Sequence, residues 1–122
     1  MRGGLNLLLL TDDAERFRGA LMVAMTHRAL GGAARLFLQM DAVRLLSPPV
    51  VAPRDEVHDR AGFPTLAALL DEALADGVAL TACQSGLALA GLTATDLDKR
   101  IETGGLASFL AATGDDDRLL TL

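Results

Sequence analysis

The chain has 122 residues, of which 51% are hydrophobic and only 3% are aromatic, with no Trp or Tyr. This length is typical of one domain with a single core, so we expect one domain over residues 1–122. The scarcity of aromatic rings argues against recognition of bases or sugars by stacking. The net charge of −5 and the isoelectric point near 4.8 disfavour binding to nucleic acid or to anionic membranes, because like charges repel.

Cysteine content and hydropathy indicate where the protein works and how it assembles. Cys83 is the only cysteine, so the chain has no internal disulfide. The apolar run near the N-terminus, residues 5–10, is too short to span a membrane and is not followed by a signal-peptide cleavage site. We therefore expect a cytoplasmic protein. A mean hydropathy of +0.35 is high for so small a domain, and it predicts a homo-oligomer whose subunits cover part of each other's surface.

The first third of the chain predicts a β-α-β unit. Residues 5–10 are typical of a strand that is buried on both faces of a parallel sheet. A helix follows, in which Asp12 is the expected N-cap and Glu15 completes an Asp version of the capping box. Gly31 and Gly32 end this helix, residues 34–39 form the second strand, and residues 41–46 form a short helix or turn. The core-facing positions of the first helix are Phe17, Ala20, Leu21, Ala24 and Met25.

The middle of the chain is less regular. Residues 47–64 hold all four prolines and five charged residues, and we predict a loop there. Loops of this length in compact domains usually serve function or subunit contact, or are disordered. Thr65 caps the next helix, which Gly77 ends, and a third strand over residues 78–82 leads to Cys83. The core-facing residues of this helix are Leu66, Leu69, Leu70, Ala73 and Leu74.

The pattern weakens after Cys83. Ser85 is the expected N-cap of a short helix that reaches Gly91, and residues 96–102 fit either a weak strand or a loop. Thr103 and Gly104 then open a last helix. Gly114 closes that helix, and residues 118–122 form a terminal strand.

Strands that alternate with helices predict the fold class. Parallel strands need crossover connections, and these connections place helices on both faces of the sheet. We therefore expect an α/β fold: a three-layer α/β/α sandwich with a mainly parallel sheet of four or five strands.

Two loops are candidates for a functional site at one edge of this sheet. Ligands of open α/β sheets bind at the carboxyl ends of the strands, where the first strand ends in Thr11, Asp12 and Asp13 and the third in Cys83, Gln84 and Ser85. These groups could be neighbours. A helix start would lower the pKa of the Cys83 thiol, whereas a nearby carboxylate would raise it. Helix capping is the ordinary role for the two aspartates.

The two histidines give weaker signals. His58, in the predicted loop, could reach this edge as a general acid or as a cationic partner of a thiolate, although a surface position is commoner. His27 lies late in the first helix, where it is either solvated or interacts with the helix dipole. Neither histidine has the spaced partner ligands of a metal site, and no phosphate-binding motif is present. We expect no metal and no cofactor.

Cys83 supports three hypotheses. N–H groups at a helix start, those of Gln84 and Ser85, would stabilise a thiolate, and a thiol without a resolving partner can carry a persulfide to the thiol of another protein. Alternatively Cys83 is a buried structural residue in a non-catalytic oligomeric interaction or small-molecule-binding module. A thiol enzyme with His58 as its base is the third hypothesis.

Several short motifs, taken in order, resemble one family. Ala82-Cys83, Gly91-Leu92, Asp96-Leu97, Gly104-Gly105 and Phe109-Leu110 precede a closing apolar strand, and in this order they resemble the DsrE/DsrF-like family. The front half agrees, with an apolar first strand, Asp12-Asp13 before an Ala-rich helix, Gly31-Gly32, and Phe37 before residues 43–46.

The resemblance implies an α/β/α sandwich, assembly into trimers or hexamers, and a persulfide on the cysteine that matches Cys83. Its partners would then be sulfur donor and acceptor proteins. Residues 47–64 match nothing in the family pattern, which leaves the identity of these partners open.

Overall fold

The structure, a computed structural model, describes residues 2–122. Its strands are β1 (Leu5–Leu9), β2 (Ala34–Leu38), β3 (Ala79–Cys83), β4 (Glu102–Gly104) and β5 (Arg118–Thr121). Its α-helices are α1 (Ala14–Ala29), α2 (Asp55–Arg60), α3 (Leu66–Ala75), α4 (Gln84–Ala90) and α5 (Leu106–Ala111). Residues 2–122 also contain two 3-10 helices, η1 (Met40–Leu46) and η2 (Ala94–Asp96).

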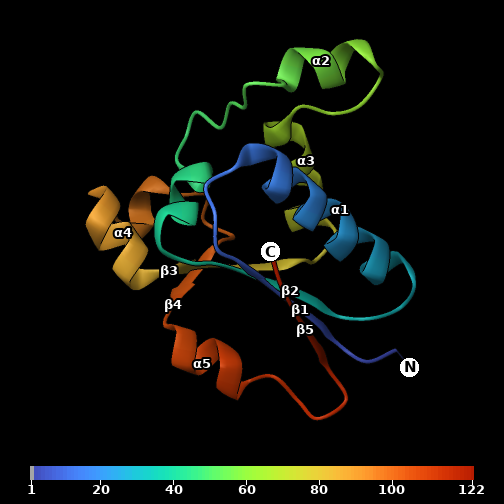
Figure 1. Ribbon diagram of the computed structural model, residues 1–122, viewed down its shortest axis with the longest axis vertical. Coiled ribbons are helices and arrows are strands. Elements are labelled where there is room, and N and C mark those ends of the chain that lie inside the picture. Colours follow the sequence, from blue (N-terminus) through green and yellow to red (C-terminus); the bar gives the residue numbers. More distant parts are fainter. Residues whose placement is uncertain (1) are drawn as a thin grey trace.

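All five strands form one parallel sheet in the order β4-β3-β2-β1-β5. The predicted α/β fold is confirmed, and the sheet is parallel throughout (Figure 1). The carboxyl ends of β1, β2 and β3 therefore lie along the same edge, with β2 in the middle.

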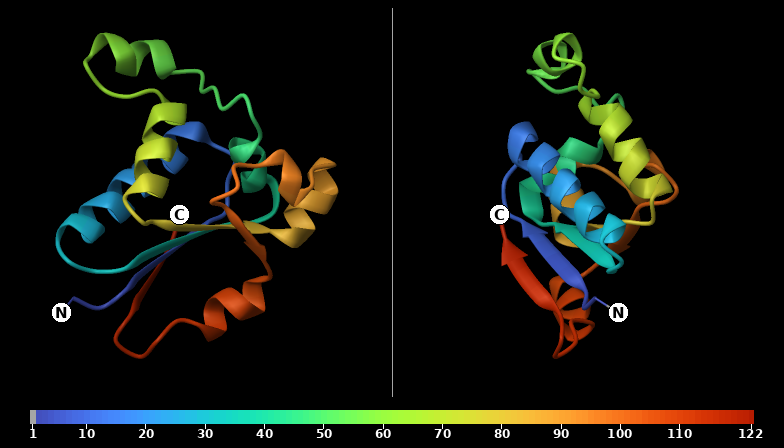
Figure 2. Two further views of the ribbon diagram at one scale, coloured as in Figure 1. Left: turned by 180° about the vertical axis from the view of Figure 1, so that it is seen from behind. Right: turned by 90° about the vertical axis from the view of Figure 1, so that its right-hand side faces the viewer.

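Helices cover the two faces of the sheet unequally. α1 and α3 pack side by side on one face, whereas α5 lies on the other (Figure 2). The register explains both contacts: Leu7, Leu36 and Leu80 share a row and are fully buried. The side chains of the next residue in each strand point to the opposite face of the sheet, and there the ring of Phe37 contacts the ring of Phe109 in α5, with the ring centroids 5.1 Å apart. The second face thus depends on one short helix.

The start of α1 differs from the predicted capping box. Asp13, not Asp12, is the N-cap, and its carboxylate accepts a hydrogen bond from the Arg16 N–H at 3.1 Å. Glu15 does not return to the cap, because its carboxylate pairs with His58, Arg18 and Arg54. The N-cap was therefore predicted one residue too early, and the prediction of a capping box with Glu15 was wrong.

Three further elements differ from the sequence prediction. The predicted loop over 47–64 contains α2. Cys83, not Ser85, is the N-cap of α4. Thr103 and Gly104 belong to β4 rather than to the last helix, because they pair with β3, and Gly105 caps α5 instead.

Other predicted elements agree with the structure. Thr65 caps α3 and accepts a hydrogen bond from the Ala68 N–H. Gly77 ends that segment with φ of 92°, a left-handed conformation that glycine adopts without strain. Within residues 2–122, no helix is both long and apolar enough to cross a bilayer.

Candidate functional site

Cys83 ends β3 and begins α4. Its backbone pairs with Gly104 of β4, and its sulfur accepts a hydrogen bond from the Gly86 N–H at 3.4 Å. A side chain that binds the third N–H of a helix acts as an N-cap, a role that serine and threonine usually fill. The thiol therefore sits against the positive end of the α4 backbone dipole, and only 6% of Cys83 is exposed.

Gly86 lets α4 lie directly against the end of β2. A Cβ at this position would overlap the backbone carbonyl of Met40 and lie 2.9 Å from its carbonyl carbon. Met40 itself has φ of 52°, which is uncommon for a residue with a side chain. This sharp turn after β2 leads the chain into η1, which packs on α4. The donor to the sulfur is thus held in place by a close backbone contact.

Gln84 and Ser85 occupy the first turn of α4, and both are exposed. Within the described chain, the sulfur receives its hydrogen bond from Gly86 and none from these two residues. The N–H groups of Gln84 and Ser85 were the predicted stabilisers of the sulfur, so the structure moves this role one residue along the helix.

The β1 loop does not join Cys83. β2 lies between β1 and β3, so the two strand ends are separated by roughly 10 Å. Asp13 caps α1, and the Thr11 hydroxyl accepts a hydrogen bond from the Asp13 N–H at 3.1 Å. Asp12 and Asp13 instead line an open hollow of about 440 Å³ with Arg54 of the following segment.

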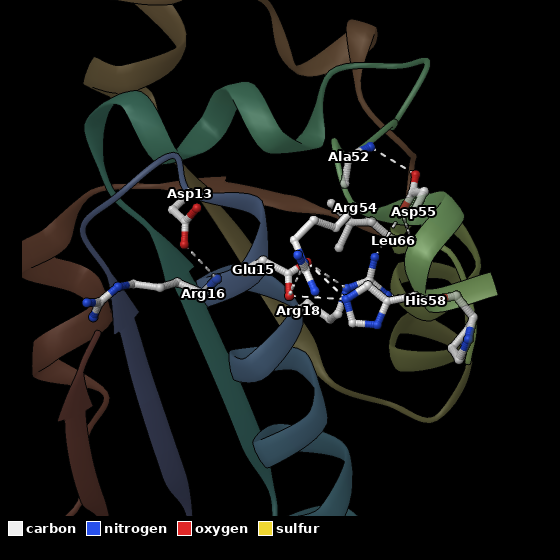
Figure 3. Close-up of polar contacts among 10 residues, drawn as sticks. Asp13, Glu15, Arg16, Arg18, Ala52, Arg54, Asp55, His58 and Leu66 are labelled. Carbon is white, nitrogen blue, oxygen red and sulfur yellow. Dashed lines mark hydrogen bonds and ion pairs between the residues drawn. The ribbon is translucent and has the colours of Figure 1, made fainter. Parts of the chain in front are cut away.

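His58 belongs to a separate cluster (Figure 3). Its Nε2 lies 3.0 Å from Oε1 of Glu15, the first-turn carboxylate of α1. Beside this pair, the Arg18 guanidinium donates to Asp55 at 2.9 Å and to the Pro64 carbonyl at 2.6 Å. α2, which carries His58, and α4, which follows Cys83, lie far apart in every view (Figures 1 and 2). The geometry thus gives no support to His58 as the base for the thiol.

Asp55 fastens α2 to the rest of the fold. Its carboxylate accepts hydrogen bonds from the Leu66 N–H at 2.8 Å and the Ala52 N–H at 2.9 Å, in addition to Arg18. Burial by itself raises the pKa of the Asp55 carboxyl, but these hydrogen bonds and the charge of Arg18 together hold that pKa below its ordinary 3.8. The carboxylate form of Asp55 therefore stabilises the fold.

The remaining sequence predictions concern His27 and metal binding. His27 lies in the last turn of α1 and donates from Nε2 to the Gly3 carbonyl at 2.7 Å, so it joins the helix end to the N-terminal segment. Among residues 2–122, no three His, Cys, Asp or Glu side chains gather as a metal site would require.

Sequence reasoning missed Gly86 and Met40, the two residues that define the surroundings of Cys83. The role of Gly86 could not be predicted, because Ser85, and not Cys83, was the expected N-cap of this helix. The positive φ of Met40 had no counterpart in the sequence, since methionine does not favour this conformation.

Comparison with solved structures supports the fold. The ychN protein from E. coli superposes with a TM-score of 0.72 at 21% sequence identity, and the match covers all of both chains. A protein of unknown function from Methanobacterium thermoautotrophicum superposes with a TM-score of 0.69 at 13% identity, again over all of both chains. At these identities, the likeness extends to the fold alone.

Comparison at the level of sequence identifies the family. No curated protein matches the chain. The family model described as the DsrE/DsrF-like family matches residues 7–122, a range that holds the whole sheet from the middle of β1 onward and includes Cys83. The chain belongs to the DsrE/DsrF-like family, which is associated with sulfur relay.

Proposed function

We propose that this protein is a small sulfur carrier of the cytoplasm, in which Cys83 holds a persulfide and passes it to a partner thiol. The hydrogen bond from the Gly86 N–H to the Cys83 sulfur at 3.4 Å carries the proposal. A sulfur anion at this position receives one N–H donor and the positive end of the α4 dipole. Family membership supplies the second support, because the family is associated with sulfur relay.

The chemistry needs one thiol and no cofactor. The Cys83 thiolate attacks the outer sulfur of a donor persulfide, the donor's S–S bond breaks, and the donor leaves as a thiolate. In the second step an acceptor thiolate attacks the outer sulfur now held on Cys83, and Cys83 leaves as a thiolate. Each step exchanges one S–S bond for another, so no external oxidant or reductant is consumed.

Access to the sulfur is the main requirement of this mechanism. Cys83 is 6% exposed, so loading requires the first turn of α4 to move away from the sulfur. α4 has only seven residues, ends at Gly91 with φ of 70°, and exposes Gln84 and Ser85. Short helices of this kind open at low cost. We assign Gln84 and Ser85 the role of the surface that a donor or acceptor protein contacts, with Thr11, Asp12 and Asp13 farther along the same edge.

We also propose that the protein is a homo-oligomer, a trimer or hexamer as the family resemblance implies. Leu119 and Leu120 on the edge strand β5 are 44% and 43% exposed, and Leu30, the C-cap of α1, is 58% exposed. An exposed edge strand with apolar side chains is a site where another chain can pair. Self-association would remove these side chains from water.

The burial of Cys83 favours a second candidate, a non-catalytic interaction or small-molecule-binding module in which the cysteine is packed. Alkylation of the native protein separates the two, because the packed thiol predicts slow modification that requires unfolding. Rapid modification of the folded protein, at a rate above its unfolding rate, excludes the structural role.

Loading tests the carrier directly. After incubation with a persulfide donor, intact mass spectrometry of the wild-type protein is expected to show the addition of one sulfur atom, which Cys83→Ser abolishes. Serine retains the N-cap, so this variant keeps the fold. An unmodified wild-type protein, under conditions that load a known carrier, refutes the proposal.

A further inference from the structure

We propose that a hollow between α1, α2 and α3 binds a small uncharged aromatic molecule of the size of phenol or indole. The hollow has a volume of about 190 Å³ and lies on the outer side of the helices that cover the first face of the sheet. Its walls come from α1, α2, α3 and the turn between α2 and α3: Arg18, Met22, His58, Phe63, Pro64 and Leu69.

The size and lining of the hollow fit an aromatic ring. Of its lining residues, Met22 and Phe63 are 53% and 58% exposed, while Leu69 is buried. Apolar cavities of about 150 Å³ in proteins hold a benzene ring. A bound ring would cover two large apolar side chains that otherwise face water, and the burial of this surface favours binding.

The charges around the hollow select an uncharged ligand. Arg18, which is 4% exposed, already donates to the Asp55 carboxylate and to the Pro64 carbonyl, and its Nε lies 3.5 Å from Glu15. The charge of Arg18 is thus already paired with carboxylates, and Glu15 is also paired with Arg54 and His58. A carboxylate on the ligand would lose its water without gaining an unpaired cation, which is unfavourable.

His58 and Phe63 add aromatic specificity. The centroids of the two rings are 6.5 Å apart and the rings are inclined at 67°, which is an edge-to-face arrangement. A third aromatic ring in the hollow can pack against both of them. The Nε2 of His58 lies 3.0 Å from the Glu15 carboxylate (Figure 3), and this contact fixes the orientation of the imidazole ring that lines the hollow.

This site is independent of the proposed sulfur chemistry. Cys83 does not line the hollow, and neither does Gly86, which donates the hydrogen bond to the sulfur. Loss of sulfur loading in a variant of Cys83 would therefore leave ligand binding intact, and loss of ligand binding would leave loading intact.

Indole fluorescence provides a direct test. Because the chain contains no Trp or Tyr, emission excited near the indole absorption band comes from the added ligand alone. Titration of the full-length protein into indole is expected to give a saturable change in emission with one site per chain. Phe63→Ala is expected to weaken binding by about tenfold, the loss of one aromatic contact and its buried area.

Matched controls decide the outcome. Val23→Ala changes a residue of α1 that is 45% exposed and does not line the hollow, and it is expected to leave the affinity unchanged. Indole-3-carboxylate is expected to bind more weakly than indole. The proposal is overturned by the absence of saturable binding, by equal weakening in Phe63→Ala and Val23→Ala, or by binding of the carboxylate as tightly as indole.

Discussion

The replacement of Gly86 by alanine tests how the surroundings of the sulfur are built. An alanine Cβ at this position would overlap the Met40 carbonyl oxygen and lie 2.9 Å from both the carbonyl carbon and the Cα of Met40. These atoms are backbone, so they cannot yield by rotating a side chain. α4 must move away from η1, and the Gly86 N–H moves with it from its position 3.4 Å from the sulfur.

The expected magnitude follows from two opposing effects. An added methyl group that is forced into a packed contact costs about 1–3 kcal/mol, whereas alanine is more favourable than glycine in a helix by about 1 kcal/mol at most. We therefore expect Gly86→Ala to lower the free energy of unfolding by roughly 1–2 kcal/mol.

Gly19→Ala is the matched control. Gly19 lies in the interior of α1, and a Cβ there would meet nothing within 4 Å. This variant is expected to raise the free energy of unfolding by about 0.5–1 kcal/mol, because it gains helix propensity without a clash. Urea denaturation followed by far-UV circular dichroism measures both. If Gly86→Ala is as stable as Gly19→Ala, the Gly86 backbone does not pack against Met40 as closely as described, and the expected clash is refuted.

Four other perturbations follow from particular contacts. Asp55 has a folded-state pKa below 3.8, so the stability that its carboxylate contributes is complete above about pH 4 and is lost as the pH falls through the folded-state pKa. Asp55→Asn is expected to lower the free energy of unfolding at neutral pH by about 1–3 kcal/mol and to weaken the loss of stability that urea denaturation measures at acid pH. An unchanged loss of stability at acid pH contradicts this. Thr65→Ala removes the cap of α3 and is expected to cost about 1 kcal/mol, with most of this restored in Thr65→Ser; equal denaturation midpoints for the two would refute a capping role. Cys83→Ser retains an N-cap and is expected to unfold within about 0.5 kcal/mol of the wild type, whereas a loss of several kcal/mol would point to a packing role for the sulfur. Leu119→Lys on β5 is expected to reduce the fraction of oligomer measured by sedimentation. Leu89→Lys, at a 66% exposed position on α4, is expected to leave this fraction unchanged, and the reverse result would place the subunit contact elsewhere.

The sequence was sufficient for the main elements because their signals are local. The apolar run that became β1 and the periodic Leu and Ala residues of α3 each match the structure within about one residue. Thr65 and Gly77 marked the ends of the α3 segment through ordinary cap chemistry.

The errors arose where tertiary contacts decide the local structure. α2 forms among prolines because Asp55 accepts hydrogen bonds from Arg18 of α1 and from Leu66 of α3, in addition to the local bond from Ala52. Thr103 and Gly104 form a strand because β3 pairs with them.

The candidate site was predicted only in part. Cys83 stands at a strand end and helix start as expected. The strand order separates Asp12 from it and the fold directs His58 to Glu15, and neither strand order nor the partner of a loop histidine can be deduced from one sequence.

Transfer of sulfur from Cys83 to a second thiol tests the central proposal most directly. The protein is loaded with a persulfide donor, separated from that donor and mixed with an acceptor thiol, and the masses of both partners are followed with time. A carrier predicts that the protein loses one sulfur atom while the acceptor gains it at the same rate, and that Cys83→Ser transfers none. A carrier role for Cys83 would be contradicted if the wild-type protein never loads, or if the Cys83→Ser variant transfers sulfur as well as the wild type does.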